Sequence, residues 1–189
     1  MSKAQVQASA RAMRLRRFSL WALPVALIAA LALRGRETAT NWWRASDLFP
    51  QPVRFDASAP LAGADWRVVS LQRVAERPDG TTVALLELEA TVRDPAPFAL
   101  LPCRIALADG TGQRWLPTFL APTEVSRLPS RRNSQAKTCG PALASKPEAG
   151  AVLAIAESFL LPRAAFAQVD VVVSLAGGRP HYLRFARGS

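Results

Sequence analysis

The 189-residue chain is poor in the residue types from which most catalytic and metal sites are built. It contains one histidine, His181, one tyrosine and two cysteines. One histidine and two cysteines cannot supply four zinc ligands without carboxylates or a partner chain. The sequence also lacks a Gly-x-Ser-x-Gly elbow and a Gly-x-x-x-x-Gly-Lys phosphate loop. We therefore predict no catalytic residue, no metal, no cofactor and no enzyme activity, with His181 in a structural or surface role.

Acidic residues are absent from the first 36 positions, which hold seven basic residues. The rest of the chain holds 17 basic and 14 acidic residues, so it accounts for only three of the ten net positive charges. Charge concentrated at one end indicates membrane topology rather than a nucleic-acid-binding surface. We therefore predict no nucleic-acid partner.

An uncharged apolar run, Phe18–Leu33, follows the basic segment. Its 16 residues would extend about 24 Å as a helix, which is short of the ~30 Å hydrocarbon core of a bilayer. Arginine side chains at both ends can reach the headgroups and make up the difference. Pro24 is tolerable in a membrane helix. The run predicts an uncleaved transmembrane signal anchor over residues 18–36.

The alternative is a cleaved signal peptide, because a basic segment before a short apolar run is typical of both. A small-x-small pattern, Ala30–Ala32, lies inside the run, and none stands at its polar boundary. We favour the anchor. The alternative function is a soluble periplasmic binding or accessory protein released by cleavage.

Charge asymmetry also predicts the orientation of the anchor. More basic residues precede the run than follow it closely, so the basic tail, residues 1–17, is expected in the cytoplasm and the C-terminal domain in the periplasm. Trp42 and Trp43 are expected at the membrane interface or on the base of the domain. Residues 37–60, with three prolines, are predicted to form a juxtamembrane segment and a stiff linker.

Two-residue alternation dominates the chain from residue 61 to residue 189. Thr81–Arg93 alternates apolar with polar side chains, and the turn Pro78–Gly80 joins it to an earlier strand, Trp66–Val74. Further short strands are expected at residues 98–107, 113–116, 151–159, 169–175 and 181–185. Residues 121–150 lack periodicity and are predicted to form a long connection with one or two short strands. The pattern predicts an all-β domain, an antiparallel β-sandwich.

Three segments, Asp65–Val68, Asp79–Val92 and Leu107–Arg114, resemble parts of the telokin-like, immunoglobulin-like domains that bacterial envelope proteins carry behind a signal anchor or lipid anchor. In those domains a long first hairpin precedes a Leu-x-Asp-x-x-Gly turn, and a late strand closes the sandwich. Ser158–Pro162 stands where that strand would be. The resemblance covers roughly residues 60–186 and implies an immunoglobulin-like β-sandwich in an extracytoplasmic setting. It supplies no catalytic residue.

The two cysteines, Cys103 and Cys139, both lie in the domain that is predicted to be exported. An oxidising compartment favours their pairing, and a bridge would tie the irregular connection to a strand. The alternatives are two free buried thiols or a redox pair. Because the spacing is far from Cys-x-x-Cys, we predict a structural disulfide.

The irregular connection contains a basic stretch with no acidic residue. Its cations are Arg127, Arg131, Arg132 and Lys137. They are expected either to contact anionic headgroups, an acidic glycan or an acidic partner, or to form a solvated loop. The favoured function is that of a single-pass cell inner-membrane protein whose sandwich serves as an interaction or scaffolding module in an envelope complex. The oligomeric state stays open.

Overall fold

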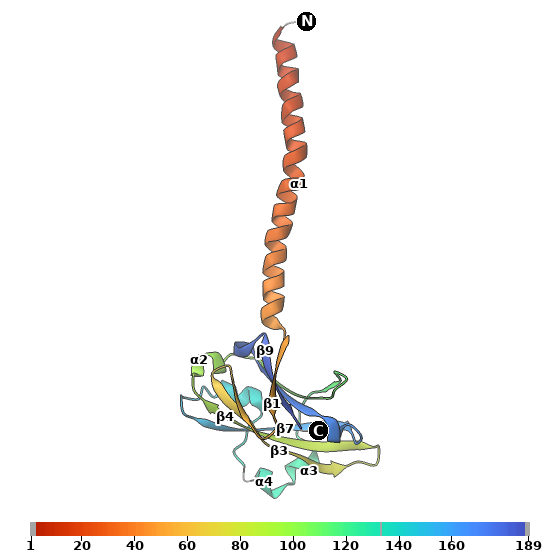
Figure 1. The fold of residues 1–189 in the computed structure, drawn as a ribbon, viewed down its shortest axis with the longest axis vertical. Coiled ribbons are helices and arrows are strands. Elements are labelled where there is room, and N and C mark those ends of the chain that lie inside the picture. The colour runs from red at the N-terminus through yellow and green to blue at the C-terminus, as the bar shows by residue number, and fades with distance from the viewer. Residues whose placement is uncertain (1–2, 133, 188–189) are drawn as a thin grey trace. The chain divides into compact units, whose positions relative to one another are not determined.

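The structure, a computed structural model, describes residues 3–132 and 134–187 (Figure 1). The side chains of residues 3–21, 37, 44 and 132 lie outside this description. The chain divides into two compact units, Met1–Trp43 and Arg44–Ser189.

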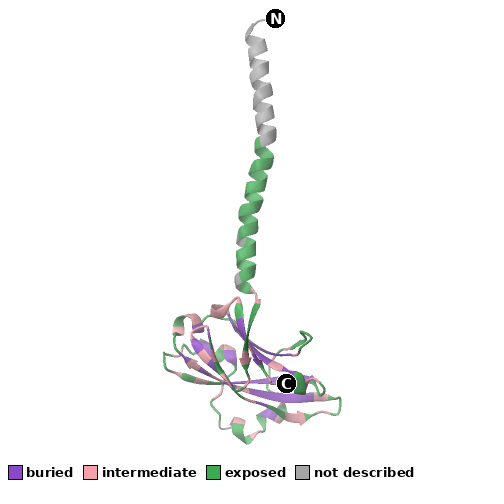
Figure 2. Cartoon of the chain, viewed as in Figure 1, coloured by how far each residue is buried: buried purple, intermediate pink, exposed green. Residues whose placement is uncertain are grey.

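The N-terminal unit consists of the helix α1, which covers Lys3–Ala45 without interruption at Pro24. It is longer than the predicted helix and includes residues 3–17 of the predicted tail. Among the residues whose side chains are described, no helix is long and apolar enough to cross a membrane, so they do not support the predicted transmembrane helix. The side chains of Phe18–Trp21, at the start of the apolar run, are not among the described ones. Figure 2 shows the described part of α1 exposed. Trp42 and Trp43 are 59% and 47% exposed, and their place at a membrane interface stays a prediction.

The C-terminal unit is mostly β, as predicted, with its strands in two sheets. The five-stranded sheet has the order β1-β9-β8-β5-β6. Its strands are β1 (Phe49–Arg54), β9 (His181–Ala186), β8 (Asp170–Leu175), β5 (Cys103–Ala108) and β6 (Arg114–Trp115). The four-stranded sheet has the order β2-β3-β4-β7. Its strands are β2 (Ser58–Leu61), β3 (Ala64–Glu76), β4 (Thr81–Val92) and β7 (Val152–Pro162).

One hydrophobic core joins the inner faces of the two sheets. Trp66 and Leu88 enter it from the four-stranded sheet, and Val173 and Phe185 enter it from the five-stranded sheet. None of these four side chains is more than 1% exposed. Large apolar side chains at alternate strand positions therefore hold the sheets face to face.

The structure corrects the predicted linker, residues 37–60, and one part of the predicted antiparallel order. The second half of that segment forms β1 and β2, and β1 pairs with β9 in parallel. Phe49 and Phe55 donate their N–H groups to the carbonyls of Pro180 and Ala186. Backbone N–H groups alternate in direction along a strand, so the nitrogens of Pro50 and Pro52 point away from β9. They face the free edge of the sheet, where no donor is needed.

The long hairpin β3–β4 confirms the predicted alternation and turn. The Asp79 carboxylate accepts from the Thr81 N–H at 2.9 Å, and Gly80 takes a φ of +80°. On the outward face, however, Val83 and Leu85 are fully buried in a second small cluster with Val125. The hairpin is therefore buried on both faces near Val83 and Leu85.

Short helices replace the strands predicted for residues 121–150, and Val125 of the first one supplies this cover. They are α3 (Thr123–Ser126), α4 (Pro129–Arg132) and α5 (Cys139–Ala144). Lys137 adds an isolated parallel bridge, to Ile155 of β7. Elsewhere the chain forms α2 (Pro95–Phe98) and the 3-10 turns η1 (Phe166–Gln168) and η2 (Ala176–Gly178).

Candidate functional site

The disulfide between Cys103 and Cys139 is present, as predicted, with Cα atoms 6.0 Å apart. Cys103 begins β5, and Cys139 begins α5. The bond therefore ties the irregular connection to the five-stranded sheet. Beyond it, Ala142 and Leu143 of α5 are buried in the shared core.

A buried carboxylate lies beside this disulfide. Glu157 of β7 is 6% exposed, and its Oε1 accepts from the Cys139 N–H at 2.7 Å. That N–H belongs to the first turn of α5, where backbone donors have no partner within the helix. Burial raises the pKa of Glu157, while the bond from Cys139 and the charge of Arg131 oppose the rise. Glu157 is thus a structural cap for α5.

The predicted basic contact residues do not form one exposed cluster. Arg127 and Lys137 are exposed, whereas Arg131 is half-buried near Glu157. The Nη1 atom of Arg131 is buried and has no hydrogen-bond partner in the described part of the chain. The side chain of Arg132 lies outside the described residues. Binding by this segment stays a prediction.

Sequence reasoning missed a hollow on the outer face of the five-stranded sheet, which we call the Arg104 hollow. Its volume is about 360 Å³. Ala106 and Val172 contribute small apolar side chains to it, and both are nearly buried. The remaining lining residues are Asp47, Arg104, Arg114, Leu116 and Ser174. The Arg104 hollow therefore combines two arginine side chains with a small apolar surface at its base.

Among the described residues that line the Arg104 hollow, the one carboxylate is already paired. Asp47 accepts from the Nε of Arg179 at 3.1 Å and from the hydroxyl of Ser174. In contrast, the structure shows no ion pair or side-chain hydrogen bond for Arg104 or Arg114 among the described residues. Arg114 lies over the Tyr182 ring, 5.6 Å from its centroid. The hollow thus carries two uncompensated positive charges.

A second hollow, of about 490 Å³, lies next to the disulfide, and we call it the disulfide hollow. Arg104 and Leu116 line both hollows, which therefore adjoin. Thr118 donates its N–H to the Ser158 carbonyl at 2.8 Å, which ties this loop to β7. The loop leaves Phe119 99% exposed and Leu116 69% exposed. The buried Glu157, which caps α5, also lines the disulfide hollow. The two hollows together, which we call the groove, combine cationic and apolar walls with this buried carboxyl group.

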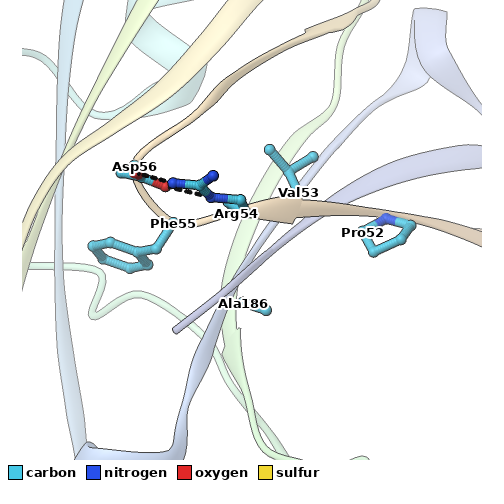
Figure 3. Close-up of a pocket in the computed structure, with 6 residues that line it drawn as sticks. All are labelled: Pro52, Val53, Arg54, Phe55, Asp56 and Ala186. Carbon is cyan, nitrogen blue, oxygen red and sulfur yellow. Dashed lines mark hydrogen bonds and ion pairs between the residues drawn. The ribbon is translucent and has the colours of Figure 1, made fainter. Parts of the chain in front are cut away.

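A third hollow lies at the far edge of the same sheet, beside the end of β1. Its walls are Pro52, Val53, Phe55 and Ala186, together with an exposed ion pair between Arg54 and Asp56 (Figure 3). Nη2 of Arg54 donates to Oδ2 of Asp56 at 2.7 Å. This hollow therefore offers no uncompensated charge, and the groove is the better candidate site.

The described residues do not provide the groove with a cluster of metal ligands. No group of three or more His, Cys, Asp or Glu side chains could hold a metal ion among them. His181 lies on β9, where its ring is 5.5 Å from that of Phe49. The chemistry that the groove offers is the binding of an anionic and partly apolar group.

No family model matches this chain, and no curated protein matches its sequence. Among solved structures, a conserved hypothetical protein from Bacillus anthracis is similar, at 11% identity and a TM-score of 0.43, over 68% of this chain and 93% of that one. The yjhA protein from Bacillus subtilis is similar at 9% identity and a TM-score of 0.41, over 73% of this chain and 99% of that one. Likeness at this level carries no argument about function.

Proposed function

We propose that the protein is a single-pass inner-membrane protein that presents its β domain in the periplasm as an interaction or scaffolding module of an envelope complex. The observation that carries the proposal is the exposure of large apolar side chains along α1. Six of them, between 56% and 70% exposed, are Leu23, Val25, Leu27, Ile28, Leu31 and Leu33. Exposed apolar surface of this extent requires a cover.

The distribution of these side chains favours lipid over protein as the cover. At 100° per residue, the six positions spread around the whole helix axis instead of forming one stripe. A partner helix would cover one stripe, whereas the hydrocarbon of a bilayer covers a helix on all sides. In the sequence, the apolar run that contains them extends back to Phe18.

Two further features support an exported interaction module. Disulfides persist in oxidising compartments, and the Cys103–Cys139 bond fits the periplasm. The groove gives the domain a surface that is suited to binding, and the exposed cations Arg127 and Lys137 add a second basic contact in this proposal. The immunoglobulin-like sandwich and its likeness to telokin-like envelope domains belong to the same proposal.

Membrane extraction tests the anchor. The intact chain should stay with membranes through alkaline carbonate and high-salt washes, and its mature mass should include the apolar run. The double variant Leu27→Lys, Leu31→Lys should be released by carbonate, because each charge at a helix centre costs about 2.5–3.5 kcal/mol. Leu116→Lys, the same change on the domain, is the matched control and should remain bound. Release of the wild type by salt refutes the anchor, and a mature chain that begins after Leu33 supports the cleaved periplasmic alternative.

Crosslinking in living cells tests the scaffold role. A photoreactive amino acid placed at exposed positions of the domain, such as Val69, Leu116 and Val152, should capture envelope proteins from at least one position. If all three positions capture only lipid or nothing in cells where the domain is exported, the module has no partner and the scaffold proposal fails.

A further inference from the structure

The Arg104 hollow has a charge that the chain itself does not balance. Its single carboxylate, Asp47, is held by Arg179 and Ser174, whereas Arg104 and Arg114 have no carboxylate partner in the described residues. In this they differ from arginines such as Arg184, which meets Asp170 at 2.7 Å. Two unpaired guanidinium groups that line one hollow therefore favour an anion from outside the chain.

The shape of the groove limits the kind of molecule that can carry this anionic group. The floor at Ala106 and Val172 is apolar, and the groove continues past Leu116 to the exposed ring of Phe119. A small inorganic anion would leave this apolar surface uncovered. Hollows of about 360 and 490 Å³ can hold side chains, whereas a flat headgroup layer would not enter them. Carboxylates match the bidentate fork of arginine.

We propose that the groove binds a segment of a partner protein in which an acidic side chain lies close to a large apolar one. The carboxylate pairs with Arg104 and Arg114, and the apolar side chain enters the disulfide hollow beside Leu116 and Phe119. The proposal rests on the interaction module described above and assigns it a site and a partner chemistry. The Tyr182 ring under Arg114 holds that guanidinium in place for the contact.

Two matched peptide pools test the proposal with the full chain in micelles of an uncharged detergent. Each pool consists of fluorescein-labelled octapeptides with randomised flanks. One pool fixes Glu and Leu two positions apart, so that both lie on one face of an extended segment, and the other has Gln in place of Glu. The wild type should retain at least five times more of the Glu pool. Arg104→Gln and Arg114→Gln should each lower that retention about tenfold, as expected for the loss of a charge-assisted bond.

Arg54→Gln is the control, because it removes the same charge from the opposite edge of the same sheet. It should leave retention of the Glu pool unchanged. Equal retention of the two pools by the wild type overturns the proposal. The proposal is also overturned if Arg54→Gln lowers retention of the Glu pool as much as Arg104→Gln and Arg114→Gln do. If phosphatidylglycerol in mixed micelles displaces the Glu pool and binds in an Arg104- and Arg114-dependent way, the occupant is a lipid headgroup and the proposal is also wrong.

Failure here is distinguishable from failure of the proposed function. If crosslinking in cells captures envelope proteins at Val69 or Val152 while the pools show no preference, the module stands and only the groove is refuted. If no position captures a protein, the module itself is refuted. Capture at Leu116 supports the groove only when the captured segment contains an acidic residue near a large apolar one and when Arg114→Gln lowers its yield.

Discussion

Removing the disulfide should lower the stability of the β domain without changing its fold. The bond closes a loop with a sequence separation of 36 residues. For such a loop, the chain-entropy model gives about 4 kcal/mol, because the bond restricts the unfolded chain. The fold should survive, since Ala142 and Leu143 still anchor α5 in the core and Glu157 still accepts from the backbone of residue 139. We choose the double variant Cys103→Ala, Cys139→Ala, which adds no hydroxyl at the buried position 139.

Urea unfolding followed by tryptophan fluorescence measures this loss, because Trp66 is fully buried in the core. With an m-value of about 2 kcal/mol/M, the midpoint should fall by about 2 M. Wild-type protein with the bond reduced should unfold at the same midpoint as the variant, and reductant should not affect the variant. A fall of less than about 0.5 M, or a reduced wild type as stable as the oxidised one, would show that the bond does not constrain the chain as argued.

Two further predictions concern the interior of the domain. Leu85→Ala should lower the free energy of unfolding in urea by about 2–4 kcal/mol, because α3 buries this outward-facing residue. Leu100→Ala, at an exposed position, is the control and should lower it by less than about 0.5 kcal/mol. Equal losses in the two variants would mean that α3 does not cover Leu85. Burial raises the pKa of Glu157, so the folded chain holds that proton more tightly, and the free energy of unfolding should fall as pH rises from the unfolded value of about 4.3 through the raised folded value. Glu157→Gln keeps an acceptor for Cys139 and should remove this slope, so that its stability relative to the wild type increases with pH; a difference that is constant between about pH 4 and 8 would refute the burial argument.

The hairpin β3–β4 was predictable because its signals are local. Asp79 and Gly80 specify the turn, and the alternation from Thr81 onward specifies which residues face the core. The strand β1 was missed for the opposite reason. Prolines at positions 50 and 52 are typical of a linker, and only the pairing with β9, more than 120 residues away in the chain, makes their missing N–H groups harmless.

The three short helices after Pro122 could not be predicted from periodicity. Each has between four and six residues, too few to show a repeat of 3.6 or to be stable alone. Tertiary contacts fix them: Val125 enters the cluster with Leu85, and Cys139 is bonded to Cys103. The basic stretch was visible in the sequence, but its Arg131 is half-buried instead of fully exposed.

The groove was invisible in the sequence because its charges come from different strands. Arg104 lies on β5 and Arg114 on β6, while the aspartate that lines the same hollow precedes β1. No spacing along the chain distinguishes these two arginines from those that are paired, such as Arg184. Only the register of β5 with β8 and β6 places the two over Ala106 and Val172, in a hollow where Asp47, already paired with Arg179, is the carboxylate among the described lining residues. A count of charges along the sequence therefore locates basic segments, whereas the groove depends on which arginines folding leaves without a carboxylate and on which of those line one hollow.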